Sequence, residues 1–489
     1  MSRVGEASGS EASGSMHRLL EAAWGIPPHL AVSLEEAEEA VREEFAQIEA
    51  MASYNQLRLL HIFQEAGITD FHLNGSTGYG YGDKGREALE AVFAAYFGGE
   101  AALVRGQIIS GTHALALGLF SSLQPGDELI SAAGPPYDTL QKVIGLHGTP
   151  DSLIENGILY KEVPTRTSTQ VAGHAPEQMF VQVSAHRSAQ APAQMPAQTL
   201  AQMLAQVPKP KDDAGDGAVD IARLLEAVSD RTRAVFFQRS KGYQWRPSIT
   251  MTELRKAIAT IKAKKPDAIC IVDNCYCEMA DTEEPGNAGA DLVIGSLIKN
   301  PGGTLAPMGG YVVGKAPLVE ACARRLYAPG LNPDMGASMG FTRPAFQGLF
   351  QAPHVVGEAL KGAVLAAEFF ARQGYDVLPG RKRIASEQPA SRSDIVQAIK
   401  LGDEGKLIRF CQAIQQACPL DAAFVPEPAM LPGYSHPVIM AGGGFIQGSS
   451  SELSADGPLR PPYAAYLQGG FSLAQIRLGL LLAAKALAE

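Results

Sequence analysis

The chain has 489 residues, of which 46% are hydrophobic and 19% are charged, and its formal net charge is -10. At about 100–200 residues per domain, this length predicts two or three domains around a large core. An acidic surface repels nucleic-acid backbones and anionic membranes, so we expect neither as a partner.

The N-terminal segment repeats Glu-Ala-Ser-Gly-Ser and has neither the apolar core of a signal peptide nor the Arg-rich face of a transit peptide. We therefore expect residues 1–33 to be a disordered tail or a linker. No run of about 18 apolar residues occurs, so no membrane span is expected. The six cysteines are too scattered for a disulfide framework. Together these features predict a cytoplasmic protein, and an organelle remains an alternative.

Residues 34–85 are predicted to form an N-terminal helical arm. Apolar residues at three- and four-residue spacing give an amphipathic pattern over residues 34–66; they are Val41, Phe45, Ile48 and Met51. A Gly/Tyr-rich loop follows over residues 74–85, and residues 86–97 have the pattern of a second helix.

Beyond residue 100, short apolar strands alternate with helices such as 221–228 and 251–263. The predicted strands are Ala101–Arg105, Glu128–Ala132, Thr232–Gln238, Ala268–Val272, Leu292–Gly295 and Gly310–Val313. This alternation predicts a mostly parallel, doubly wound α/β sheet, which we place in a large domain over residues 86–330.

Two further segments have a different composition. Residues 165–217 are rich in Ala, Gln and Pro, and such a tract cannot bury a core, so we expect a disordered insertion. After Pro329-Gly330 the pattern becomes helix-rich, as in 355–373, with short strands later. We assign residues 331–489 to a smaller C-terminal α+β domain.

Two ionisable residues follow predicted strands. Lys299 lies just beyond the strand 292–295, in Gly-Ser-Leu-Ile-Lys-Asn-Pro-Gly-Gly, and Asp273 ends the apolar run Ile269-Cys-Ile-Val-Asp. Both would lie at the sheet edge where α/β proteins bind ligands. A carboxylate there can keep a pyridine nitrogen protonated. A surface lysine and a helix-capping aspartate are the simpler alternatives.

Small residues open a predicted helix in Ser110-Gly-Thr-His-Ala, where free backbone N–H groups favour an anion such as phosphate. Ser296 could add a hydroxyl to the same anion. Tyr137 follows the strand 128–132 and could stack on a planar ring or serve as a core aromatic.

In this order, these stretches resemble the fold-type-I pyridoxal-phosphate enzymes. More closely, the chain resembles the methionine γ-lyase-like or aluminium-resistance family, which is related to the cystathionine lyases. The resemblance runs from about Phe45 to Leu480, apart from the Ala/Gln insertion. Its motifs include Thr77-Gly-Tyr-Gly-Tyr-Gly-Asp-Lys-Gly-Arg86, Pro136-Tyr-Asp-Thr-Leu140, Val272-Asp-Asn-Cys-Tyr276, Pro432-Gly-Tyr-Ser-His-Pro-Val-Ile-Met440 and Glu452-Leu-Ser-Ala-Asp-Gly-Pro458.

The resemblance implies a role for each candidate residue. Lys299 would be the Schiff-base lysine, Asp273 the partner of the cofactor's ring nitrogen, and Tyr137 the stacking aromatic. The implied phosphate cup consists of Ser110, Gly111, Thr112 and Ser296. Tyr79 or Tyr81, with Arg86, would reach the cofactor phosphate of a neighbouring subunit, and Arg477 would bind the substrate carboxylate.

The resemblance therefore implies a carbon–sulfur lyase that acts on a small sulfur-containing amino acid and releases a thiol, a 2-oxo acid and ammonia. A homodimer or homotetramer with shared sites is implied, and no metal is expected. Other eliminations, transamination, and a non-catalytic stress or metal-resistance role remain alternatives. A dinucleotide site at Gly80-Tyr-Gly-Asp-Lys-Gly85 would need a preceding apolar strand, and the segment from Phe71 is too short and polar.

Overall fold

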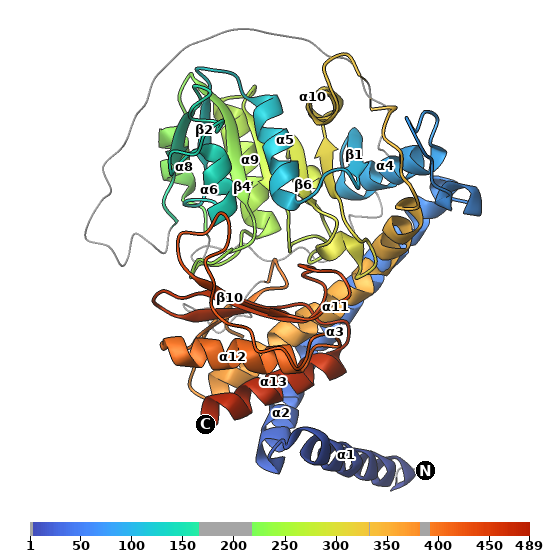
Figure 1. Ribbon diagram of the computed structural model, residues 1–489, viewed down its shortest axis with the longest axis vertical. Coiled ribbons are helices and arrows are strands. Elements are labelled where there is room, and N and C mark those ends of the chain that lie inside the picture. The colour runs from blue at the N-terminus through green and yellow to red at the C-terminus, as the bar shows by residue number, and fades with distance from the viewer. Residues whose placement is uncertain (1–2, 166–217, 332, 382–391) are drawn as a thin grey trace.

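The computed structural model describes residues 3–165, 218–331, 333–381 and 392–489, with side chains from residue 14 onward. Two sheets organise the chain as a large lobe above a small lobe (Figure 1). Most of the predicted insertion, residues 166–217, lies outside the described residues. In the described part of the chain, no helix is both long enough and apolar enough to cross a membrane.

The large lobe is built on a seven-stranded sheet with the order β1-β7-β6-β5-β4-β2-β3. Its strands are β1 (Ala101–Arg105), β2 (Glu128–Ser131), β3 (Leu159–Glu162), β4 (Thr232–Gln238), β5 (Ile269–Asp273), β6 (Leu292–Ser296) and β7 (Gly310–Gly314). The five strands from β6 to β3 run parallel, whereas β7 and β1 are antiparallel to their neighbours. The six strands predicted from the sequence all occur, with ends that differ by at most one residue.

Helices cover both faces of this sheet, because alternate residues of its central strands are apolar on both sides. On β4, Phe236 packs toward α5, α6 and α10, whereas Val235 packs toward α8 and α9. These helices are α5 (Gly111–Ser122), α6 (Asp138–Ile144), α8 (Ile221–Ala227), α9 (Met251–Lys264) and α10 (Ala316–Leu326), with the 3-10 turns η3 (Pro285–Ala288) and η4 (Asn300–Gly302). The doubly wound arrangement confirms the prediction.

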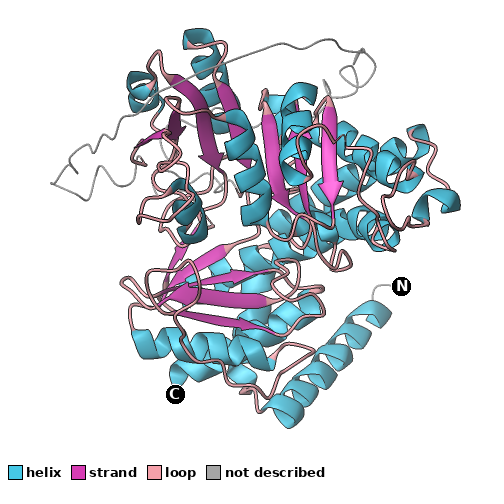
Figure 2. Ribbon diagram, turned by 45° about the horizontal axis from the view of Figure 1, so that its top comes forward, coloured by secondary structure: helices cyan, strands magenta, loops and turns pink. Residues whose placement is uncertain are grey.

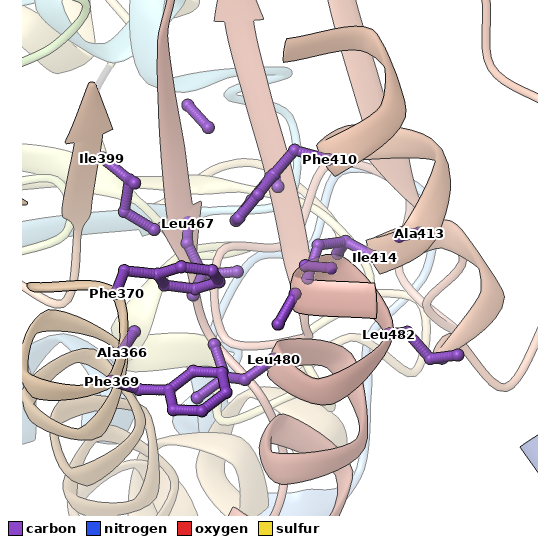
Figure 3. Packing of buried hydrophobic residues seen from close by; sticks show 14 of the residues in the cluster. Ala366, Phe369, Phe370, Ile399, Phe410, Ala413, Ile414, Leu467, Leu480 and Leu482 are labelled. Atoms are coloured by element: carbon purple, nitrogen blue, oxygen red, sulfur yellow. The ribbon is translucent and has the colours of Figure 1, made fainter. Parts of the chain in front are cut away.

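The small lobe has a five-stranded antiparallel sheet in the order β10-β11-β12-β9-β8. Its strands are β8 (Asp376–Leu378), β9 (Gln397–Lys400), β10 (Val438–Gly442), β11 (Ser454–Pro458) and β12 (Ala464–Gln468). One face packs on α12 (Glu404–Gln416), α13 (Leu473–Ala488) and the end of α11 (Thr342–Arg372). Figure 3 shows this core, in which Phe370 and Phe410 meet between the helices and the sheet. The opposite face is turned toward the large lobe (Figure 2).

Two long helices connect the lobes. Helix α3 (Arg42–Glu65) lies beside α11, and Figure 1 shows both running diagonally past the two sheets. The remaining arm elements are α1 (Arg3–Trp24), α2 (Pro28–Ala40), η1 (Asp70–Leu73) and α4 (Lys84–Phe97).

The N-terminal segment differs from the prediction. Residues 3–24 form α1 and Pro28 opens α2, so most of the segment expected to be a disordered tail is helical. Ile26 and Leu34 are buried in the small-lobe core, and this burial stabilises the segment. The single helix predicted over 34–66 is interrupted at Val41, where α2 ends and α3 begins.

Candidate active site

Lys299 and Asp273 follow neighbouring parallel strands. Asp273 is the last residue of β5, and Lys299 lies three residues beyond the end of β6. Since β5 and β6 are parallel, both residues lie at the carboxyl edge of the sheet. Burial raises the pKa of Asp273, and the positive charge of the nearby Lys299 acts against this rise. The structure therefore brings together the two residues that the sequence singled out.

Asp273 is almost completely buried, with 3% of its surface exposed. Burial raises the pKa of its carboxyl group to about 6, although Lys299 and a hydrogen bond act against this rise. The hydrogen bond is donated by the backbone N–H of Cys275 to Oδ1, at 3.1 Å. A desolvated carboxylate of this kind favours a positively charged N–H partner.

Lys299 lies where the two lobes meet. Its Nζ donates a hydrogen bond to the Gly448 carbonyl of the small lobe at 2.9 Å and lies 4.7 Å from the centre of the Tyr276 ring. The Ser451 hydroxyl donates to the Lys299 carbonyl at 3.1 Å. Burial lowers the pKa of the amine, and the negative groups around it act in the opposite direction. The lysine therefore favours its neutral form more than an exposed lysine does.

The N-terminus of α5 lies next to this pair. Ser110 caps the helix and accepts the N–H of His113 at 3.0 Å. A Cβ at Gly111 would lie 3.3 Å from the Cβ of Ser296, so glycine allows the helix to approach the end of β6. Within the described chain, the N–H groups of Gly111 and Thr112 have no hydrogen-bond acceptor. They are free to bind an anion.

Tyr137 completes this side of the site. Its hydroxyl lies 2.9 Å from Oγ1 of Thr112, and its backbone N–H donates to Oε1 of Gln238 at 2.8 Å. Burial raises the pKa of the Tyr137 phenol, and the nearby Asp273 charge raises it further. The aromatic ring therefore lies beside both the α5 N-terminus and the buried carboxylate.

The three residues expected to reach a neighbouring subunit, Tyr79, Tyr81 and Arg86, lie apart from Lys299 and Asp273. Arg86 is buried on α4 and donates to the carbonyls of Gly80 and Gly336, both at 2.8 Å. Tyr79 and Tyr81 are 72% and 66% exposed, with ring centres 5.7 Å apart. Among the described residues, none of the three contacts Lys299 or Asp273 through a hydrogen bond or ring interaction. Their role toward a neighbouring subunit stays a prediction.

Arg477 is not among the residues that the structure gathers around Lys299. It lies on α13, and its Nε donates to Oε2 of Glu38 on α2 at 2.7 Å. Helix α13 packs against the small-lobe core, on the sheet face that is turned away from the large lobe. The prediction that Arg477 binds the substrate carboxylate is therefore not supported, because an ion pair with Glu38 holds the guanidinium at the rear of the sheet.

A carboxylate that was not expected from the sequence faces the lysine. Asp456 lies on β11, and burial raises its pKa to about 7, against the lowering effects of the Lys299 charge and a hydrogen bond with Tyr243. The alternation of Ser454, Asp456 and Pro458 with smaller residues could have indicated a strand with one polar face. The sequence around Tyr243 has no such alternating pattern, because this residue lies in the loop after β4.

A second buried pair joins the lobes. Lys241, in the loop after β4, donates to both carboxylate oxygens of Asp394 at 2.7 and 2.9 Å, and to the Val396 carbonyl at 2.9 Å. Both side chains are fully buried. This ion pair fixes the small-lobe sheet relative to the end of β4.

The described residues contain no group of three or more His, Cys, Asp or Glu side chains arranged to hold a metal ion. The buried cysteines Cys270, Cys275 and Cys277 form no disulfide bond with any described residue.

Comparison with known proteins identifies the family. The model of the methionine gamma-lyase family matches residues 31–186 and 208–488. The chain belongs to this family. The uncharacterized protein YnbB of Bacillus subtilis is 42% identical over 433 residues, which cover 88% of this chain and 90% of that protein.

Solved structures of family relatives agree with this assignment. A Clostridium acetobutylicum protein, described provisionally as a cystathionine beta-lyase involved in aluminum resistance, has a TM-score of 0.82 and 37% identity, covering 96% of this chain and 98% of that one. A Clostridium novyi protein, described as a carbon-sulfur lyase involved in aluminum resistance, has a TM-score of 0.80 and 37% identity over the same shares of the two chains.

A more distant match concerns the fold alone. The pyridoxal-5'-phosphate dependent protein YhfS of Escherichia coli is 16% identical, with a TM-score of 0.53, over 89% of this chain and 96% of that one. With the mostly parallel large sheet and the smaller C-terminal sheet, this match confirms the predicted fold-type-I architecture.

Proposed function

We propose that this member of the methionine gamma-lyase family is a pyridoxal-phosphate-dependent carbon–sulfur lyase. Its substrate would be a sulfur-containing amino acid, from which it would release a thiol, a 2-oxo acid and ammonia. The observation that carries the proposal is the position of Asp273 and Lys299 at the carboxyl ends of the neighbouring parallel strands β5 and β6. The descriptions of the Clostridium relatives support the reaction class.

The residues present fit this cofactor. Lys299 would bind it covalently through Nζ, and the buried Asp273 carboxylate would pair with its ring nitrogen. The unpartnered N–H groups of Gly111 and Thr112 would receive the phosphate, with Ser110 and Ser296 beside them. Tyr137 would lie against the ring.

Two ionisable groups of the chain would divide the acid–base work. Bound pyridoxal phosphate draws electrons from the substrate and so makes its Cα proton removable. Once the substrate's amino group has displaced it from the cofactor, the freed Lys299 amine would accept that proton at Nζ, since its lowered pKa favours the neutral form. Asp273 would stay ionised and hold a proton on the ring nitrogen through their charge pairing.

One experiment tests the cofactor and its site together. Borohydride reduction of the holoenzyme, followed by peptide mapping, should place the cofactor on Lys299. A Lys299→Ala variant should lose the label, whereas Lys315→Ala, which removes a lysine paired with Asp291 at the surface, should keep it. A label on another lysine would contradict the assignment.

The reaction class needs a separate assay. The holoenzyme is incubated with cystathionine, methionine and cysteine, and thiol and 2-oxo acid are measured. The proposal expects both products from at least one of these substrates. Stoichiometric formation of the pyridoxamine form would favour transamination instead, and a colourless protein without turnover would favour a non-catalytic role.

A further inference from the structure

A short loop of the small lobe reaches Lys299. Residues 443–449 follow β10 and lead toward β11, and we call them the strap. The Gly448 carbonyl of the strap accepts a hydrogen bond from Nζ of Lys299 at 2.9 Å. A Cβ at Gly448, where φ is +78°, would lie 3.6 Å from Cδ1 of Ile298, the residue before the lysine. The strap therefore lies against the segment of the large lobe that carries Lys299.

Few other contacts hold the strap against the large lobe. Phe445 is 71% exposed, and the Glu452 carboxylate of the small lobe accepts the N–H groups of Phe445 and Ile446 at 2.7 and 2.9 Å. The Ser449 N–H donates to the Ile446 carbonyl at 3.0 Å, within the strap itself. Among the described residues, Lys299 is the only residue of the large lobe that forms a hydrogen bond with the strap. A loop with so few buried contacts opens easily, so this bond contributes directly to keeping it closed.

The bond to Gly448 depends on the chemical state of the lysine amine. A free amine has at least two hydrogens to donate. A lysine nitrogen that is joined covalently to pyridoxal phosphate keeps at most one hydrogen and must lie at the cofactor's carbon atom, so Gly448 loses its donor. The Ser451 hydroxyl, in contrast, donates to the Lys299 backbone carbonyl at 3.1 Å and is independent of the amine. The covalent state of Nζ therefore changes one of these contacts and leaves the other in place.

We propose that Lys299 controls the strap: its free amine holds residues 443–449 closed over the site, and its bond to the cofactor releases them. This inference rests on the proposed attachment of the cofactor to Lys299, and it adds how the site opens and closes. In the loaded protein without substrate the strap is open. When the substrate's amino group displaces the lysine, the freed amine binds the Gly448 carbonyl again and the strap closes over the substrate. The lone pair of Nζ stays available for the Cα proton, because the bond to Gly448 uses an N–H.

Hydrogen–deuterium exchange of the wild-type protein tests this control in three states, none of which requires turnover. Lys299 is free in the apoprotein and bonded to the cofactor in the holoenzyme. Methoxyamine, which has no carboxylate, frees it again: its nitrogen replaces Nζ on the cofactor's carbon atom, and its two hydrogens pass to the departing lysine. The amides of Phe445, Ile446 and Ser449 should exchange slowly in the apoprotein and slowly again with methoxyamine. In the holoenzyme they should exchange about fivefold faster, as expected for the loss of one hydrogen bond.

The α5 N-terminus provides an internal reference for the bound cofactor. The N–H groups of Gly111 and Thr112, which are proposed to receive the phosphate, should exchange fastest in the apoprotein and more slowly in both states that contain the cofactor. If the strap follows this same order, the cofactor itself covers the strap and the proposed control by Lys299 is wrong. Equal exchange of the strap in all three states would overturn it as well.

Variants assign the effect to the lysine amine. The strap of Lys299→Met apoprotein should exchange as fast as that of the wild-type holoenzyme, and slow exchange there would contradict the proposal. The control Lys315→Ala removes a lysine paired with Asp291 and should match the wild-type apoprotein. Ser451→Ala should raise exchange in all three states without changing their order, and loss of the order would show that Ser451 rather than the amine holds the strap.

The outcome also separates this inference from the proposed function. A cofactor found on another lysine after borohydride reduction contradicts the proposed function. A cofactor on Lys299 together with constant exchange of the strap contradicts only the control of the strap. If the three states differ as expected but no sulfur substrate is cleaved, the proposed reaction fails while the control of the strap stands.

Discussion

Burial acts in opposite directions on the two central residues of the site. It raises the pKa of Asp273 and lowers that of Lys299, so each group alone favours its neutral form. Their mutual attraction opposes this effect. A cofactor with a protonated ring nitrogen would give the Asp273 carboxylate a positively charged hydrogen-bond donor. Without the cofactor, Lys299 and the Cys275 N–H stabilise this carboxylate only in part.

The first prediction concerns the stability of the cofactor-free protein. The pKa of Asp273 rises from 3.8 to about 6 on folding, so its ionised form destabilises the folded state. This cost is absent below the unfolded pKa, grows as the pH rises between the two values, and is complete above about pH 6, where two pKa units correspond to about 3 kcal/mol. Asp273→Asn should therefore stabilise the apoprotein in urea unfolding at pH 7.5, and less so at pH 5.

The same variant should lose cofactor function, because a neutral amide cannot hold a proton on the ring nitrogen. Asp376→Asn is the control for the amide substitution, since its carboxylate is 70% exposed and should change stability little at either pH. Equal stability of Asp273→Asn and wild type at pH 7.5 would contradict the argument.

Residue-level predictions from the sequence succeeded where a strand fixes the position. Lys299 and Asp273 could be placed together, because parallel neighbours end at one sheet edge. Arg477 and Asp456 could not, since their positions depend on how the small lobe packs against the rest of the chain. The Glu38 partner of Arg477 is more than 400 positions away in the sequence, and no local pattern reports such a contact.

At the scale of elements, the loop after Lys299 is held by α11. Gly348 on α11 lies so close that a Cβ there would be 2.1 Å from the Gly302 carbonyl oxygen of η4, and a Cβ at Gly303 would be 2.1 Å from the Gly348 carbonyl oxygen. The backbone of this turn thus packs directly against the backbone of the helix. This contact fixes the position of the segment that follows Lys299.

The second prediction follows from this contact. Gly348→Ala should force the helix and η4 apart, cost about 1–3 kcal/mol in urea unfolding, and weaken pyridoxal-phosphate binding. Gly357→Ala on the same helix is the control, because its new methyl would meet side chains and no backbone, Ala52 at 3.1 Å and Ile48 at 4.0 Å, and alanine favours the helix. Similar losses in both variants would show that the contact with η4 has no special importance.

The third prediction tests the ion pair between the lobes. Lys241→Met leaves the Asp394 carboxylate buried without its cation and should cost about 3–5 kcal/mol of unfolding free energy. The double variant with Asp394→Leu should recover only part of this loss, because the buried Arg246 and the nearby Arg392 also interact with the Asp394 charge. Lys400→Met, which removes a surface pair with Asp376, should change stability by about 1 kcal/mol or less.

Should the double variant be as unstable as Lys241→Met alone, packing rather than charge would account for the loss.

Some helices and strands could be predicted from the sequence and others could not. The apolar strands of the large sheet were found because both of their faces are buried. Strand β3 was missed, since Leu159–Glu162 lies at the sheet edge and only Leu159 is buried. The start of α11 at Thr342 was missed because Pro344 and Gly348 weaken its helical pattern.

At the scale of the whole molecule, two segments that hydrogen bonds join carry several exposed apolar side chains. Residues 74–83, which lie between η1 and α4, and residues 333–341 are joined by hydrogen bonds, including the N–H of Met339 to the Ser76 carbonyl at 3.0 Å. We call this surface the arm patch; its exposed side chains are Phe71, Tyr79, Tyr81, Leu331 and Met339. An apolar surface of this kind marks an interface, and the buried Arg86 beneath it anchors both loops.

The fourth prediction is that the arm patch joins two copies of this chain. Met339, which is 80% exposed, should become an unfavourable charge at the interface when changed to glutamate, so Met339→Glu should shift the protein toward monomer in sedimentation equilibrium. It should also weaken cofactor binding if Tyr79 or Tyr81 reaches the neighbouring site. Phe424→Glu changes a 64% exposed side chain on the small lobe and should leave both properties intact. A Met339→Glu protein with unchanged association would place the interface elsewhere, and with it the proposed reach of the two tyrosines.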